Sequence, residues 1–188
     1  MVYEALVSAL KRLGRSPLTI KKVIDLGCGT GLLGELIANE MPWVELSGVD
    51  LSARMVEISR ERQSRRGAHV YTSVNQEDAA TYLSSIKIHS IDAILASDVF
   101  IYVGDISNLL AESSKCLDKD GVLGFTVENY VGPGLKLLKS GRFGHSLSYI
   151  EKVASEHGFE VLIWKDCVLR QQGGVNVNGA SVILRKIK

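Results

Sequence analysis

A short apolar run at residues 22–27 ends in the glycine-rich turn 27–31, Gly-Cys-Gly-Thr-Gly. Glycine lets the backbone adopt positive φ and lets a ligand approach the main chain closely. Apolar residues at helical spacing then occupy residues 33–41, so a helix begins beside the turn. The unpaired N–H groups at the start of a helix favour an anionic group. The pattern therefore predicts a buried strand, a ligand-binding turn and a helix.

Apolar strands alternate with amphipathic helices along the rest of the chain. Further strands are predicted at residues 43–49, 70–74, 91–97 and 121–127, and two long strands at 159–169 and 180–187 flank a turn rich in Gly and Asn. This alternation predicts an α/β fold with a doubly wound, mostly parallel sheet and helices on both faces. Ligands of such sheets bind beyond the carboxyl ends of the strands, where the glycine-rich turn lies.

The length of 188 residues fits one domain, residues 1–188. Residues 1–21 supply an amphipathic helix and a lead-in to the first strand. Residues 128–147 break the strand–helix rhythm with Pro133 and several glycines, and they predict an insert on the substrate side.

The composition argues against several classes of protein. Lys and Arg total 22 and Asp and Glu total 21, so the net charge of +1 gives no general attraction to nucleic acid or anionic membranes. No run approaches the ~20 apolar residues of a membrane span. The three cysteines, Cys28, Cys116 and Cys167, are scattered and indicate neither a disulfide framework nor a metal site. We expect a reducing, cytoplasmic location.

An acidic residue, Asp50, ends the second predicted strand, about twenty residues after the glycine-rich turn. A carboxylate there can accept hydrogen bonds from both hydroxyls of a ribose. The spacing of Gly29, Gly31 and Gly34 is also a literal GxGxxG, which dinucleotide-binding enzymes use. Spacing alone therefore leaves a nicotinamide-dependent oxidoreductase open.

Longer sequence motifs are more specific than this glycine spacing. Residues 23–31, Val-Ile-Asp-Leu-Gly-Cys-Gly-Thr-Gly, resemble motif I of class I S-adenosylmethionine-dependent methyltransferases. Residues 48–52 resemble the second motif of that family and residues 91–98 its fourth-strand motif. The resemblance spans about residues 22–188 and implies a seven-stranded sheet of order 3-2-1-4-5-7-6 with the last strand antiparallel.

Within that family, Tyr71 with Asp78, residues 98–105 and residues 142–149 are most similar to small methyltransferases often attached to tetratricopeptide repeats. No such repeat occurs in this chain. The acceptors of that group are poorly defined, so this closer resemblance does not identify the acceptor.

The resemblance implies S-adenosylmethionine as cofactor and S-adenosylhomocysteine as product. The 27–31 backbone would face the methionine moiety, with Asp25 helping to hold its ammonium, and Ser97 would lie near the transferable methyl group. Asp50 would take the ribose hydroxyls and Leu51 would pack on adenine. The implied cofactor-binding residues are Asp25, Gly27, Cys28, Gly29, Thr30, Gly31, Asp50, Leu51, Asp78, Ala79 and Ser97.

Three residues are candidates for the acceptor side. Asp98 follows Ser97 and would either line the acceptor pocket or cap the next turn, and Tyr102 would form a pocket wall or pack in the core. His145 has an unperturbed pKa near ~6.5, which suits a general base, although a histidine at a helix start needs no catalytic role.

The implied activity is an enzyme of class EC 2.1.1, which transfers a methyl group by in-line displacement to a small-molecule acceptor. Alignment of the nucleophile can supply ~7–11 kcal/mol of such a barrier, so no catalytic triad is required. A protein or RNA acceptor remains an alternative, as does a non-catalytic cofactor-binding module, which the short segment before the first strand would suit. The sequence does not name the acceptor, its reacting atom or the oligomeric state.

Overall fold

A mixed nine-stranded sheet forms the centre of the computed structural model, which describes residues 1–187, with Gln172 described by its backbone alone. Lys188, the last residue of the predicted domain, lies outside the described residues. The strands are β1 (Lys22–Leu26), β2 (Glu45–Asp50), β3 (Ser73–Gln76), β4 (Ile91–Ala96), β5 (Leu117–Asn129), β6 (Leu135–Leu137), β7 (Phe143–His145), β8 (Phe159–Gln172) and β9 (Val175–Lys186).

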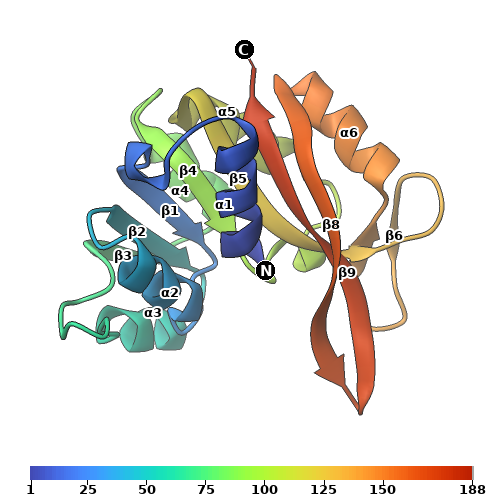
Figure 1. Cartoon of the computed structure of the whole chain (residues 1–188). Helices are drawn as coiled ribbons and strands as arrows, with labels where there is room; N and C mark the ends of the chain where they lie inside the picture. Colours follow the sequence, from blue (N-terminus) through green and yellow to red (C-terminus); the bar gives the residue numbers. More distant parts are fainter. Residues whose placement is uncertain (188) are drawn as a thin grey trace.

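Helices cover both faces of the sheet (Figure 1). They are α1 (Val2–Arg12), α2 (Leu32–Glu40), α3 (Ala53–Arg60), α4 (Ala79–Ser85), α5 (Ser107–Cys116) and α6 (Leu147–Glu156), with short 3₁₀ turns η1 (Pro17–Thr19) and η2 (Phe100–Tyr102). The first three helices share one apolar cluster with the sheet, and the last three share another. The predicted α/β class with a doubly wound sheet is therefore confirmed.

Five parallel strands, in the order β3-β2-β1-β4-β5, carry the site. β1 is buried over four of its five residues and β4 over five of its six, because helices pack on both faces. The chain order reverses between β1 and β4. The carboxyl ends of these two strands therefore define the place where a ligand is expected.

The predicted number of seven strands is wrong, and the order of the whole sheet differs from 3-2-1-4-5-7-6 because two strands are added beside β5; among the seven predicted strands, β9 lies between β5 and β8 as expected. The expected last two strands are β8 and β9, and β9 pairs antiparallel with β5. Two further strands, β6 and β7, arise inside the 128–147 insert. They form because β5 continues past its last pairing with β4, Ala96 with Phe125, and its overhanging Glu128 and Asn129 pair with β7.

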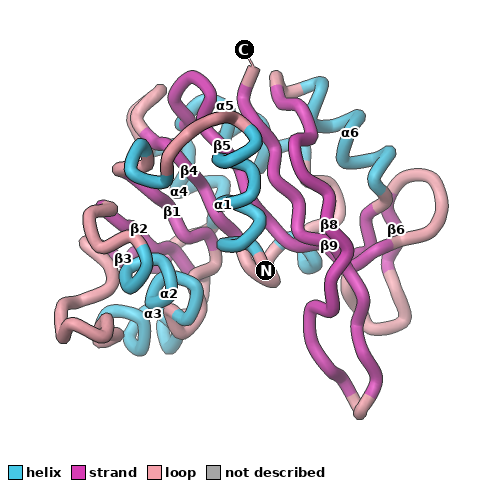
Figure 2. Tube along the Cα trace, viewed as in Figure 1, coloured by secondary structure: helices cyan, strands magenta, loops and turns pink. Residues whose placement is uncertain are grey.

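The β8–β9 hairpin is long and extends beyond the other strands, as Figures 1 and 2 show. Its far end lies on the side of the sheet where the parallel strands end (Figure 1). Side chains from this hairpin can therefore reach the expected ligand site.

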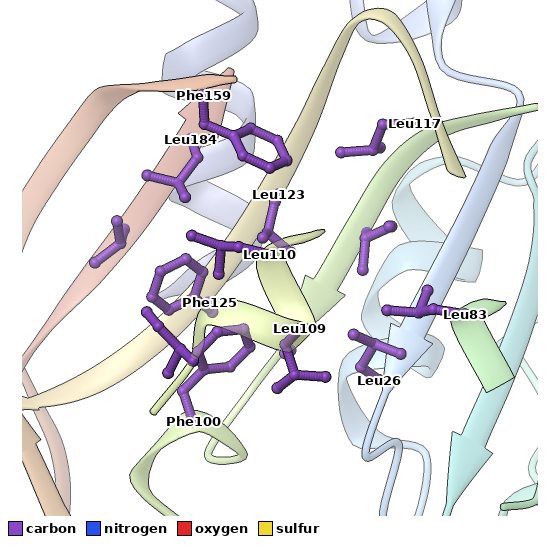
Figure 3. Close-up of a cluster of buried hydrophobic side chains, with 14 of the residues drawn as sticks. Leu26, Leu83, Phe100, Leu109, Leu110, Leu117, Leu123, Phe125, Phe159 and Leu184 are labelled. Carbon is purple, nitrogen blue, oxygen red and sulfur yellow. The ribbon is translucent and has the colours of Figure 1, made fainter. Parts of the chain in front are cut away.

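The larger apolar cluster fixes the loop that follows β4. Figure 3 shows Phe100 of η2 against Phe125 of β5, with Leu109 of α5 beside them. The two phenyl rings stack with centroids 4.1 Å apart and both side chains are fully buried. This packing anchors η2 directly after β4, so the residues between them have a defined position at the sheet edge.

Candidate functional site

A cavity of about 860 Å³ lies at the carboxyl ends of the parallel strands. This volume is typical of ligand-binding pockets. Nine of the residues singled out from the sequence line it: Gly27, Gly29, Asp50, Leu51, Asp78, Ala79, Ser97, Asp98 and Tyr102. Five others, Asp25, Cys28, Thr30, Gly31 and His145, do not line it.

The glycine-rich turn has the backbone conformation that its composition suggests. Gly27, Gly29 and Gly31 have φ of 61°, 55° and 82°, in the left-handed region that favours glycine. A side chain on Gly27 would overlap Val99, whereas no atom lies within 4 Å of the space where a side chain on Gly29 would begin. The turn therefore leaves room for a ligand against the Gly29 backbone.

Asp50 is tied to this turn. Its Oδ2 accepts a hydrogen bond of 2.9 Å from the Gly29 N–H, and its Oδ1 accepts one of 2.9 Å from the Ser52 N–H. Each carboxylate oxygen can accept a second hydrogen bond. Asp50 can therefore hold vicinal hydroxyls while it fixes the turn beside them.

The neighbouring end of the cavity combines apolar surface with a carboxylate. Leu51 is 70% exposed and Met55 lines the same wall. Asp78 precedes α4, and its Oδ1 accepts hydrogen bonds from the N–H groups of Ala80 and Thr81 at 3.0 and 3.1 Å. An exposed leucine beside a capped helix start suits a flat heterocycle with an amino group.

Asp25 lies behind the turn rather than in the cavity. It is 1% exposed, and Tyr71 donates a hydrogen bond of 2.7 Å from its hydroxyl to Asp25 Oδ2. Burial raises the pKa of Asp25 to about 7. Cys28 is also buried, which raises its thiol pKa to about 12, so this thiol is not poised as a nucleophile.

The other end of the cavity is formed after β4. Asp98 has φ of 64°, unusual for a residue with a side chain, and its N–H donates to Thr126 Oγ1 at 2.9 Å. Arg170 of β8 donates to Asp98 Oδ1 at 2.8 Å and also pairs with Glu128. Sequence reasoning missed these three supports, because nothing local in the sequence links them to Asp98.

The two remaining acceptor-side candidates differ in placement. Tyr102 lines the cavity and is 62% exposed, with the Arg142 guanidinium 5.8 Å from its ring centroid. His145 is 0% exposed, and its Nε2 lies 3.0 Å from the carbonyl oxygen of Gly104. Burial lowers the His145 pKa. The structure therefore places His145 behind the loop that follows η2, away from the cavity.

Within residues 1–187, no group of three or more His, Cys, Asp or Glu side chains is arranged to hold a metal ion. Among the helices of the same residues, none is both long and apolar enough to cross a membrane.

Comparison with known proteins identifies the family. Residues 24–123, more than half of the chain, match the family model described as a methyltransferase domain. Malonyl-(acyl-carrier protein) O-methyltransferase of Paenibacillus sp. (strain JDR-2) is 25% identical over 177 residues, covering 86% of this chain and 63% of that protein. Ubiquinone biosynthesis O-methyltransferase of Pasteurella multocida (strain Pm70) is 29% identical over 118 residues, covering 60% of this chain and 48% of that protein. The chain thus spans about half to two thirds of the length of these relatives.

Solved structures agree on the fold. Magnesium protoporphyrin IX methyltransferase from Synechocystis PCC 6803, solved with bound S-adenosylhomocysteine, superposes with a TM-score of 0.69 at 18% identity, covering 97% of this chain and 81% of that one. A SAM-dependent methyltransferase from Methanosarcina mazei gives a TM-score of 0.70 at 14% identity, covering 92% and 98%. At such identities the likeness shows the fold alone. Together with the matched model over residues 24–123, it shows that the chain belongs to the methyltransferase domain family.

Proposed function

We propose that this chain is an S-adenosylmethionine-dependent methyltransferase that acts on a small-molecule acceptor. The observation that carries the proposal is that one continuous cavity is lined by the glycine-rich turn and Asp50 and also by Asp98 and Tyr102. A cofactor and its acceptor must meet in one such space for a direct group transfer. Membership of the methyltransferase domain family supports the same activity.

The residues present fit this cofactor. Asp50 would accept the ribose hydroxyls and Leu51 and Met55 would flank the adenine. Asp78 would accept a hydrogen bond from the adenine amino group. The backbone of Gly27 and Gly29 would lie against the amino-acid end, where the open space at Gly29 leaves room.

The cofactor, when bound, supplies an activated methyl group on a sulfonium. The task of the chain is then to align the acceptor and to exclude competing water. Ser97 and Asp98 follow β4 directly and line the same cavity as Gly29 and Tyr102. The Asp98 carboxylate can take a proton from the acceptor, and the paired Arg170 holds that carboxylate in place.

The acceptor side rests on Asp98 and Tyr102. His145, the third acceptor-side candidate from the sequence, does not line the cavity, and its Nε2 lies 3.0 Å from the Gly104 carbonyl oxygen. The two curated relatives described above are O-methyltransferases, so an oxygen is the first acceptor atom to test. Kinship with the small methyltransferases that carry tetratricopeptide repeats remains part of the proposal.

Binding and turnover test the proposal separately. Isothermal titration should detect S-adenosylhomocysteine and no comparable binding of NADH. Transfer of label from methyl-labelled S-adenosylmethionine to a panel of phenols, carboxylic acids and amines should then give a labelled product. Binding of NADH alone would overturn the proposal in favour of an oxidoreductase, and binding without label transfer to any acceptor, including protein and RNA, would favour a non-catalytic module.

A further inference from the structure

Tyr71 is a buried residue that the proposed function does not use. It lies before β3 and is 8% exposed, and it reaches β1 by donating its hydroxyl hydrogen to Asp25. Neither residue lines the cavity. Burying a hydroxyl and a carboxylate costs free energy, because both groups lose their hydration. A role for this pair in shaping the neighbouring turn is therefore worth testing.

Three glycines make room for Tyr71. A side chain on Gly34 would overlap the Tyr71 hydroxyl, and the Cβ of a side chain on Gly31 or Gly48 would lie 3.1 Å from the ring. Gly34 and Gly48 have no positive φ, so their backbone conformation does not require glycine. Packing against Tyr71 therefore accounts for these two glycines.

The hydrogen bond links Tyr71 to the start of α2. The Gly34 N–H, in the first turn of that helix, also acts on the Asp25 carboxylate and opposes the rise in its pKa. A carboxylate is well placed there, because the first N–H groups of a helix have no partner within it. Tyr71, Asp25 and Gly34 thus form one connected unit behind the glycine-rich turn.

A second side chain supports the turn from the same side. Arg62 donates from Nε to the Thr30 carbonyl oxygen at 2.7 Å and pairs with Glu35 of α2 at 2.8 Å. Its Cβ and Cγ lie 3.5 Å from the position of a Cβ on Gly31. Like Tyr71, Arg62 does not line the cavity. Both residues therefore act on the turn from outside the ligand space.

We propose that Tyr71 is a positioning residue for the cofactor: through Asp25 and the adjoining glycines it holds the 27–31 turn in the conformation that receives the amino-acid end of S-adenosylmethionine. This inference rests on the proposed function. The adenosine end is held by other residues, Asp50, Leu51 and Asp78, and no hydrogen bond joins Tyr71 to any of them within the described part of the chain. Asp50 contacts the turn through the Gly29 N–H but is also held by the Ser52 N–H, so loss of the Tyr71 hydroxyl should weaken the amino-acid end more than the adenosine end.

Two ligands separate the two ends. S-adenosylhomocysteine contains the amino-acid end, whereas 5′-methylthioadenosine keeps the adenosine and the sulfur and lacks that end. Tyr71→Phe retains the ring among the glycines and removes only the hydrogen bond to Asp25. In isothermal titration we expect this variant to bind S-adenosylhomocysteine about tenfold more weakly, the scale of one hydrogen bond to a charged group. Its affinity for 5′-methylthioadenosine should stay within about twofold of the wild type.

Tyr82→Phe is the matched control. Tyr82 is 5% exposed within the larger apolar cluster, and the polar side chains that act on its hydroxyl are Ser47 and Asn75, away from the glycine-rich turn. This control should lose thermal stability and keep the wild-type ratio of the two affinities. Arg62→Met provides a second variant, because it removes the hydrogen bond to Thr30 and should show the same selective loss.

The outcomes are distinct. An unchanged affinity of Tyr71→Phe for S-adenosylhomocysteine, or an equal loss for both ligands, would overturn the positioning role. Should Tyr71→Phe fail to fold, a wild-type affinity ratio in Arg62→Met would overturn it instead. Failure of the wild-type protein to bind S-adenosylhomocysteine would overturn the proposed function itself.

Discussion

Replacement of Asp50 by alanine gives the sharpest test of the cofactor-binding end. In the folded chain this carboxylate accepts backbone hydrogen bonds from Gly29 and Ser52, each 2.9 Å long. In the proposed complex it would also accept the ribose hydroxyls. A hydrogen bond to a charged group contributes about 1.5–3 kcal/mol, so losing one ribose bond should weaken binding by roughly ten- to a hundredfold. Isothermal titration of S-adenosylhomocysteine into Asp50→Ala measures this loss directly.

A matched control excludes a general effect on folding. Asp92 also accepts two backbone hydrogen bonds, from the N–H groups of Lys21 and Lys22 at 2.8 Å each, and it does not line the cavity. Asp92→Ala should therefore cost comparable thermal stability and leave the affinity unchanged. The ribose assignment would be refuted if Asp50→Ala bound within about twofold of the wild type, or if Asp92→Ala lost affinity equally.

Three further predictions concern stability. Gly27→Ala should lower the melting temperature, because it places a side chain at φ of 61° and against Val99; an unchanged melting temperature would contradict the packing. Arg170→Met should cost about 1–3 kcal/mol in urea unfolding, because it removes the guanidinium that is paired with the Glu128 and Asp98 carboxylates, and adding Glu128→Gln should recover part of that loss. Burial raises the pKa of Asp25 to about 7 in the folded state, against ~3.9 in the unfolded state. Between these two pH values the folded state binds more protons than the unfolded state, so the free energy of unfolding should fall as pH rises from ~4 to ~7. Asp25→Asn should remove that part of the slope in denaturant titrations across this range, and an unaltered slope would contradict the assignment.

Burial explains which strands could be read from the sequence. β4 coincides closely with the predicted residues 91–97, because a strand covered on both faces is a continuous apolar run. β3 begins at Ser73 rather than at the predicted residue 70, because the apolar Val70 and Tyr71 pack before the strand starts. β6 and β7 have three residues each and form by pairing with the overhanging end of β5. Such pairing depends on distant parts of the chain, so the local sequence does not predict these two strands.

In the candidate site, too, some residues could be predicted from local sequence motifs and others could not. Residues at the ends of β1, β2 and β4 were found because each motif places its side chains at a strand end, and strand ends of a parallel sheet meet at one edge. Tyr71 and Arg170 act from segments far from the residues that they hold, 46 positions from Asp25 and 72 from Asp98. A single sequence does not show which residues so far apart along the chain are in contact in the fold. Their discovery therefore required the fold.

The supports divide the cavity into two ends that are held independently. Tyr71 and Arg62 hold the glycine-rich turn that follows β1, and Arg170 and Thr126 hold Asp98, which follows β4. The two groups share no hydrogen bond within the described residues. Arg62 and Tyr71 lie between α3 and β3, whereas Thr126 lies on β5 and Arg170 on β8. The end that would hold the cofactor is thus supported within residues 22–78, separately from the residues that hold Asp98. The match to the methyltransferase domain model ends at residue 123, before Thr126 and Arg170, the two residues that bond to Asp98.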